Sequence, residues 1–145
     1  IKIITIINNK NMSEIIKIED FIKIDIRVGQ ILSVEKVPDT YKLLKLSVDL
    51  GLKKFSQENF SPEHSTDANV LGEERDIRQI VSGIATYFPD IQTLVNKKCM
   101  FVANLEPRVI RGLESEGMIL AVSTDDGKFS LLTPNNEIPV GTRAK

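Results

Sequence analysis

The sequence predicts a mainly β protein, a small and partly closed barrel of five or six short strands. Three observations favour this fold class. Apolar and polar residues alternate over several short segments, with the two-residue period of half-buried strands. Glycines stand inside two of these segments, as a curved sheet requires at its bends. Turn residues separate the segments, and 145 residues are enough for one ordinary core.

The first elements along the chain are a helical turn and two strands. Residues 18–22 are expected to form one short helical turn. Residues 25–37 alternate over most of their length, and Gly29 inside this strand predicts a bulge or a sharp bend. A Pro-Asp turn follows, and residues 43–50 alternate again as the second strand.

A polar segment separates the second strand from the third, which we expect at residues 78–85. Residues 52–76 show no sustained periodicity and carry a net charge of -3, so we expect a flexible, exposed acidic insertion. Residues 77–112 carry +3 instead. The overall net charge of -1 therefore conceals a basic half, and a site for nucleic acid would be a local patch.

The second half of the chain completes the barrel pattern. Residues 89–95 are expected to form a short helix of about two turns with Asp90 as its cap. Strands are expected at residues 98–103, 117–123 and 129–132, the last two joined by an Asp-Gly turn. The OB-fold has this anatomy: a five-stranded Greek-key barrel, here with one short helix between strands 3 and 4 and extra C-terminal strands and turns. A β-sandwich or an SH3-like barrel also fits the pattern.

The loop at residues 104–118 is the most informative segment. It is polar, contains a glycine turn and lies between two apolar strands, where a β scaffold presents a binding surface. Arg108 and Arg111 offer fixed positive charge and planar donor groups that suit phosphate. We therefore expect nucleic acid as the partner.

Further candidates for the same surface lie outside this arginine pair. Lys42, Lys45 and Arg78 are candidate phosphate contacts, although exposed cations also solvate ordinary surfaces. Asn104 and Ser115 offer hydrogen-bonding groups to RNA, or else fix the local backbone. Met118 could lie against a base or sugar, or pack in the core.

Several classes of function lack support. The single cysteine, Cys99, excludes an intrachain disulfide and a cysteine-based zinc cluster, and it stands in an apolar run as a buried thiol would. No catalytic residues, metal site or cofactor are predicted, because phosphate-loop and nucleophile-elbow motifs are absent. No apolar run approaches the ~18 residues of a membrane span, so we expect a cytoplasmic protein. Residues 1–13 are expected to be a disordered leader or linker, with Met12 the physiological start.

Four ordered motifs carry a resemblance to a known family. They lie at residues 21–31, 41–51, 78–85 and 104–121. Together they resemble the tRNA-binding domain found as the C-terminal domain or β subunit of methionyl-tRNA synthetase and as a free-standing, structure-specific tRNA-binding protein. The resemblance runs from about residue 18 to residue 145, excepting the acidic insertion, and assigns residues 14–145 to one domain. The sequence departs from the family pattern at Thr40-Tyr41, where Ala-Asp is usual, and in its longer insertion.

The resemblance implies an OB-fold that binds tRNA by shape and backbone, often as a homodimer, and assists methionyl-tRNA synthetase in cis or in trans. The sequence is also similar to a small secretion chaperone, so a chaperone-like or docking module is the alternative. That group departs from the run Val81-Ser82-Gly83-Ile84 seen here. With no tryptophan and two tyrosines, the chain is poor in groups that stack on bases. Tyr41 and Tyr87 stay as candidate aromatic contacts to RNA.

Overall fold

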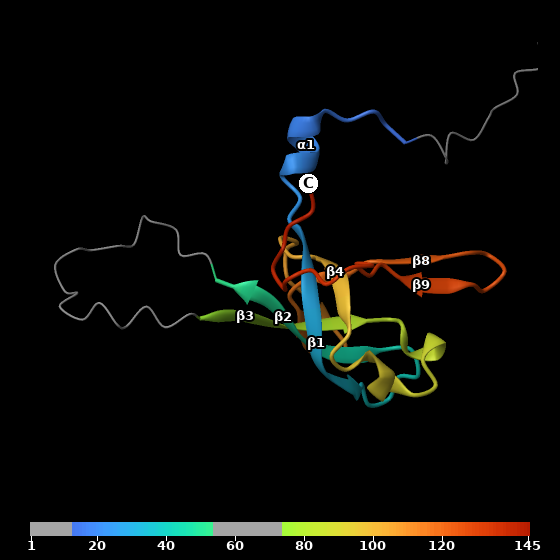
Figure 1. The fold of residues 1–145 in the computed structure, drawn as a ribbon. Helices are drawn as coiled ribbons and strands as arrows, with labels where there is room; N and C mark the ends of the chain where they lie inside the picture. The colour runs from blue at the N-terminus through green and yellow to red at the C-terminus, as the bar shows by residue number, and fades with distance from the viewer. Residues whose placement is uncertain (1–12, 54–73) are drawn as a thin grey trace, which may run out of the picture.

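The structure is a computed structural model and describes residues 13–53 and 74–145. These residues form mostly strands, and the main sheet is antiparallel with five strands in the order β3-β2-β1-β4-β7 (Figure 1). The sheet curls into a half-barrel, consistent with an OB-like all-β fold, so the predicted fold class is confirmed. The elements are α1 (Ile18–Ile22), β1 (Ile26–Lys36), β2 (Leu44–Leu52), β3 (Arg75–Ser82), η3 (Ala85–Tyr87), η4 (Ile91–Leu94), β4 (Lys98–Val102), β5 (Arg108–Ile110), β6 (Leu113–Ser115), β7 (Met118–Ile119), β8 (Ala121–Ser123) and β9 (Phe129–Leu131).

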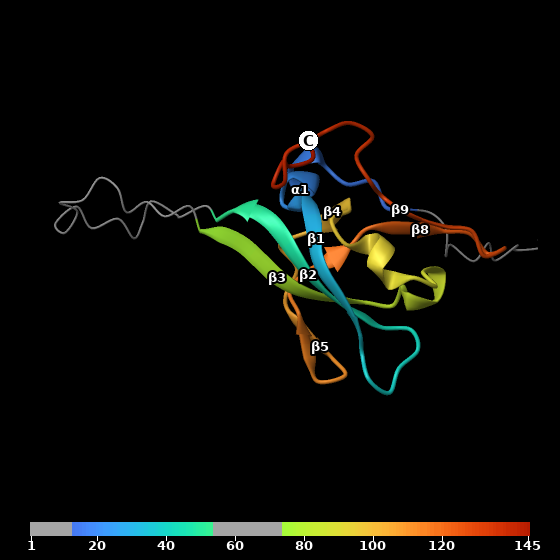
Figure 2. The same ribbon diagram turned by 60° about the horizontal axis from the view of Figure 1, so that its bottom comes forward.

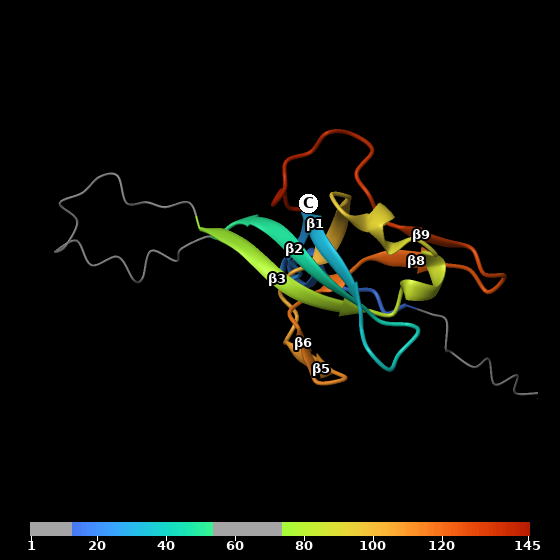
Figure 3. The ribbon, with the colours of Figure 1, turned by 90° about the horizontal axis from the view of Figure 1, so that it is seen from below.

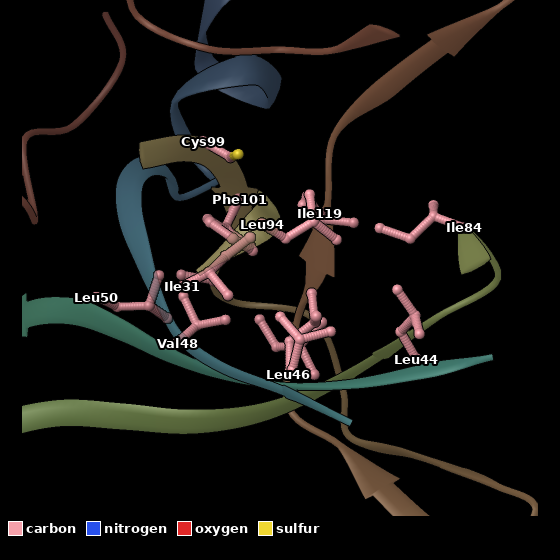
Figure 4. Packing of buried hydrophobic residues seen from close by; sticks show 13 residues of the cluster. Ile31, Leu44, Leu46, Val48, Leu50, Ile84, Leu94, Cys99, Phe101 and Ile119 are labelled. Carbon is pink, nitrogen blue, oxygen red and sulfur yellow. The ribbon is translucent and has the colours of Figure 1, made fainter. Parts of the chain in front are cut away.

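The core lies inside the curl of this sheet. Alternate residues of β2 point inward and are fully buried, as the two-residue period of a strand requires. They meet side chains from β1, β3, β4, β7 and η4, as Figure 4 shows. The fully buried members are Ile31, Leu44, Leu46, Val48, Leu50, Ile80, Leu94, Cys99 and Phe101. Burial raises the pKa of the Cys99 thiol to about 11, so this cysteine behaves as a structural apolar group.

Gly29 has a different role from the predicted bulge. The register of β1 against β2 shifts between Ile31 and Ser33, two residues farther along. At Gly29 itself, an added Cβ would lie 2.6 Å from a ring carbon of Phe101 and 2.9 Å from a methyl group of Leu50. Glycine is therefore required here because a core aromatic ring packs directly against the backbone.

The connection between β3 and β4 contains two short 3₁₀ helices, so the prediction of a two-turn helix at residues 89–95 was wrong in type and length. Asp90 is the expected cap, since its carboxylate accepts a hydrogen bond from the Gln92 amide at 3.1 Å. The segment ends after one turn because Leu94 is anchored in the core and Val95 already has extended backbone angles.

The acidic insertion is shorter than its predicted bounds. β2 runs to Leu52 and β3 begins at Arg75, so both ends of the 52–76 segment are strand. Lys53 continues the ladder by donating its amide to the Glu74 carbonyl at 2.9 Å. The two strands leave the barrel together (Figure 1). The rest of the predicted insertion, residues 54–73, and the predicted leader up to Met12 lie outside the described residues.

The last strands differ from the prediction of one strand at residues 117–123. Leu120 divides this stretch into β7, which joins the main sheet, and β8, which pairs with β9 in a projecting hairpin (Figure 1). The C-terminal segment then returns to β1. Val28 donates its amide to Thr142 at 2.9 Å, and Ala144 donates to Ile26 at 2.7 Å. Within the described residues, no helix has the length and apolar character needed to cross a membrane.

Candidate nucleic-acid interface

The predicted polar loop contains a short, regular hairpin. β5 and β6 pair antiparallel from Arg108 opposite Ser115 to Ile110 opposite Leu113. Arg111 and Gly112 form the two-residue turn, with φ angles of 51° and 78°. Positive φ at both positions is the geometry of a type I′ turn, whose twist matches that of the strands. The hairpin therefore presents its arginines from an ordered frame.

The base of this hairpin is fixed to β3. Ser115 is buried, and its Oγ accepts the amide of Val81 at 3.0 Å and donates to the Gly117 carbonyl at 3.2 Å. Gln79 donates its side-chain amide to the Glu114 carbonyl at 2.9 Å. The Glu116 amide donates to the Gln79 carbonyl at 2.9 Å, which draws the end of the hairpin onto the edge of the sheet. The bond to Gly117 is the local backbone contact named as the alternative for Ser115, whereas the bond to Val81 reaches a distant strand. A contact of Ser115 with RNA stays a prediction.

Arg108 and Arg111 are both exposed on the hairpin. Neither side chain has an ion-pair partner among the residues that the structure describes, so their donor groups are available to a ligand. Glu114 lies opposite Val109 across the hairpin. Its side chain therefore shares the face of Val109 and lies on the face opposite to Arg108.

Arg78 is engaged within the protein. Its guanidinium holds both oxygens of Asp76, with Nε 2.9 Å from Oδ1 and Nη2 2.8 Å from Oδ2. The remaining amino group donates to the carbonyls of Ala103 and Glu116. Hydrogen bonding to Arg78 lowers the pKa of Asp76, and the same bond raises the pKa of Arg78. A phosphate contact by Arg78 remains a prediction, but its donors already join β3 to β4 and to the hairpin base.

Asn104 and Met118 occupy different environments. The Asn104 side chain accepts the amide of Asp25 at 2.8 Å and donates to the carbonyl of Lys23 at 2.6 Å. It therefore ties the end of β4 to the segment that follows α1, which is a distant backbone and not the local one expected as the alternative. A contact of Asn104 with RNA stays a prediction. Met118 at the start of β7 is 46 % exposed, so its side chain stays accessible to a ligand.

The two candidate lysines lie near the loop that joins β1 to β2. Lys45 in β2 pairs with Glu35 of β1 at 2.6 Å, so its charge is partly compensated. Lys42 lies within the loop, residues 37–43, with its Nζ 5.4 Å from the ring centroid of Tyr41. This loop and the β5–β6 hairpin project from the same side of the sheet, as Figures 2 and 3 both show. Arg108, Arg111 and Lys42 therefore gather on one side of the barrel.

The sequence analysis missed a network of charged groups that joins β1, β3 and the C-terminal segment. Arg27 donates to both oxygens of Asp25, with the shorter bond at 2.7 Å, and lies 3.4 Å from Asp76. Arg143 from the C-terminal segment lies 3.7 Å from the same Asp25. Asp25 directly precedes β1 and stands two residues before Arg27. This spacing was the available signal, because residues two apart in an extended segment point to one side. Asp76, predicted to belong to the mobile insertion, is instead buried on β3.

Comparison with known proteins agrees with this geometry. The model of the putative tRNA-binding domain family matches residues 68–143. The chain is 39% identical over 136 residues to the methionine–tRNA ligase of Parabacteroides distasonis, an alignment that covers 94% of this chain and 16% of the ligase. It thus spans a small part of the curated relatives, and the matching family describes a binding domain rather than a catalytic one.

Two solved structures are similar to this chain over most of its length. A protein of Pyrococcus horikoshii described as related to methionyl-tRNA synthetase superposes with a TM-score of 0.69 and 34% identity, covering 92% of this chain and 100% of the other. The chaperone CsaA of Bacillus anthracis superposes with a TM-score of 0.65 and 25% identity, covering 91% and 100% respectively. The family match spans β3 to β9, and the superpositions extend over most of the described barrel. The chain belongs to the putative tRNA-binding domain family.

Proposed function

We propose that this domain binds tRNA through its phosphate backbone and overall shape, with Arg108 and Arg111 of the hairpin as the principal contacts. The conformation of Arg111 is the observation that carries the choice of residues. Its φ of 51° is one that asparagine or glycine adopts at lower cost. An arginine in this exposed turn, where nothing in the fold requires it, is best explained by the charge that it presents to a ligand.

The chemistry follows from the guanidinium groups. Each can bind a phosphate oxygen pair through two parallel hydrogen bonds, and each neutralised phosphate releases counterions. The hairpin fixes the backbone positions from which both side chains extend, so the arrangement of phosphates on a folded RNA becomes the property that is recognised. Lys42 extends this surface along the β1–β2 loop, and Met118 borders it.

We further propose that the domain assists a methionyl-tRNA synthetase in the cytoplasm, joined to it or as a separate subunit. A second, weak contact linked to a catalytic contact raises apparent affinity by about 10²- to 10⁴-fold. A symmetric homodimer would double the surface. Exposed isoleucines on α1, Ile18 at 65 % and Ile22 at 60 %, support such pairing. Light scattering coupled to gel filtration tests it, and a monomer at micromolar concentration would exclude it.

The main experiment is a salt titration of binding to folded tRNA, with single-stranded RNA of equal length as competitor. We expect a preference for tRNA and an affinity that falls steeply with salt. Arg108→Ala and Arg111→Ala should each reduce the slope of log K against log salt by about 0.7–0.9, the value for one phosphate contact. Lys128→Ala is the matched control, since Lys128 lies on the separate β8–β9 hairpin and should leave the slope unchanged. Parental behaviour of both arginine variants would show that the hairpin is not the site.

The second candidate function is a chaperone-like or docking module. The similarity to CsaA favours it, together with Val109, whose side chain is 74 % exposed on the hairpin. In that case the domain would bind unfolded polypeptide and be indifferent to tRNA. Competition between a reduced, unfolded protein and tRNA for the same surface distinguishes the two functions.

A further inference from the structure

The β1–β2 loop presents an aromatic ring with no role in the core. Tyr41 is 76 % exposed, the most exposed aromatic side chain among the described residues. Tyr87, the other tyrosine, stacks on Phe129 with ring centroids 4.0 Å apart and planes 6° apart. Among the tyrosines, Tyr41 is therefore the one with no ring partner in the core. Its loop projects from the same side of the sheet as the β5–β6 hairpin (Figures 2 and 3).

The backbone around Tyr41 is held in one conformation. The hydroxyl of Thr40 accepts the amides of Lys42 and Leu43, each at 3.2 Å, in a local turn. The Lys42 carbonyl accepts the amide of Ala85 at 3.0 Å, and Val37 donates to Leu43 at 3.3 Å across the neck of the loop. A loop restrained at both ends presents its side chain with little ordering cost on binding.

Lys42 orients the ring and leaves one face open. Its ammonium lies over the ring of Tyr41, 5.4 Å from the centroid, in a cation–π contact. With a cation on one face, the opposite face is free for a second planar group. The ammonium stays on the first face, where it can bind the phosphate of a neighbouring nucleotide.

We propose that Tyr41 stacks on an unpaired nucleobase of the bound tRNA, with Lys42 holding the adjoining phosphate. Nucleobases offer a planar face that aromatic rings bind with little regard to sequence, but only where the base is unstacked from its neighbours. Backbone contacts by the hairpin and a base contact by the loop would together select folded RNA with an exposed base over continuous duplex. This inference rests on the proposed function and adds a specificity element to it.

The test uses the fluorescence of Tyr41 itself. The chain has no tryptophan and two tyrosines, so Tyr87→Phe leaves Tyr41 as the sole emitter. Phenylalanine preserves the stack on Phe129, which keeps the fold intact. In this variant we expect unmodified tRNA to quench the tyrosine emission in a saturable way. A blunt-ended, fully paired RNA duplex with the same number of nucleotides should bind through its phosphates without that quenching.

A second measurement uses substitution at the ring. Tyr41→Ala should weaken tRNA binding at least about fivefold, the loss of one base stack, and should keep the slope of log K against log salt because no charge is removed. Tyr41→Phe should restore most of the lost affinity. Salt-dependent tRNA binding with unchanged emission, or equal quenching by the paired duplex, would overturn the stacking proposal and leave the phosphate-binding function standing. Absence of any tRNA binding would overturn both.

Discussion

Replacing Arg78 with alanine separates a structural role for this residue from a role in binding phosphate. The substitution removes the guanidinium that grips Asp76 and that donates to two carbonyls at the hairpin base. Asp76 is 8 % exposed, so its carboxylate would be left buried without its main partner. Breaking a buried ion pair costs about 3–5 kcal/mol. Arg27 remains 3.4 Å from Asp76, so we expect the lower end of this range.

Urea unfolding followed by circular dichroism measures this loss. With a typical dependence on urea of ~1–3 kcal/mol per molar, a loss of about 3 kcal/mol lowers the midpoint by roughly 1–3 M. The salt slope of tRNA binding by the folded variant should stay at the parental value. A midpoint within about 0.3 M of the parent, combined with a shallower salt slope, would refute the reasoning and identify Arg78 as a phosphate contact.

Three further predictions concern single positions. Gly29→Ala should cost about 1–3 kcal/mol, since its Cβ would lie 2.6 Å from the Phe101 ring, whereas Gly83→Ala, with no neighbour within 4 Å, should cost far less in the same urea assay. Arg111→Asn should stabilise the hairpin by up to about 1 kcal/mol in thermal unfolding and yet weaken tRNA binding, two opposite changes that a purely structural arginine would not produce. Asp76 has a folded-state pKa below its ordinary 3.8, so its contribution to stability is full above about pH 4 and is lost as pH falls through the lowered value. Asp76→Asn should flatten the acid dependence of the free energy of unfolding. A parental pH profile of stability in the variant would show that Asp76 is not the group responsible.

Periodicity in the sequence was enough to locate the main strands. The alternation of Leu44, Leu46, Val48 and Leu50 corresponds to an inward-facing row in β2, because burial of one sheet face sets the two-residue period. The Asp-Gly turn and the Asp90 cap were also predicted correctly, because each depends on a few adjacent residues. Local chemistry of this kind can be identified without knowing the fold.

The errors have a common physical cause, which is contact between distant segments. The packing of Phe101 against Gly29 and the burial of Asp76 beneath Arg78 depend on strands brought together only by the sheet. The same holds for the candidate site. Arg78 was grouped with Arg108 by charge alone, and only the structure shows that one arginine is engaged and the other open. Which of the open groups bind tRNA remains a prediction.

The pairing of the C-terminal segment with β1 has a consequence for how the chain folds during synthesis. Arg143 donates to the carbonyl of Ile22, 121 positions earlier, and Ala144 donates to Ile26. β1 precedes the other described strands of the barrel in the sequence, and it therefore waits for nearly the whole domain before its hydrogen bonding is complete. Contacts of such long sequence separation slow folding, and the strand edge exposed meanwhile is open to other chains. We expect the barrel to reach its final stability late, in one cooperative step, when residues 141–144 close along β1.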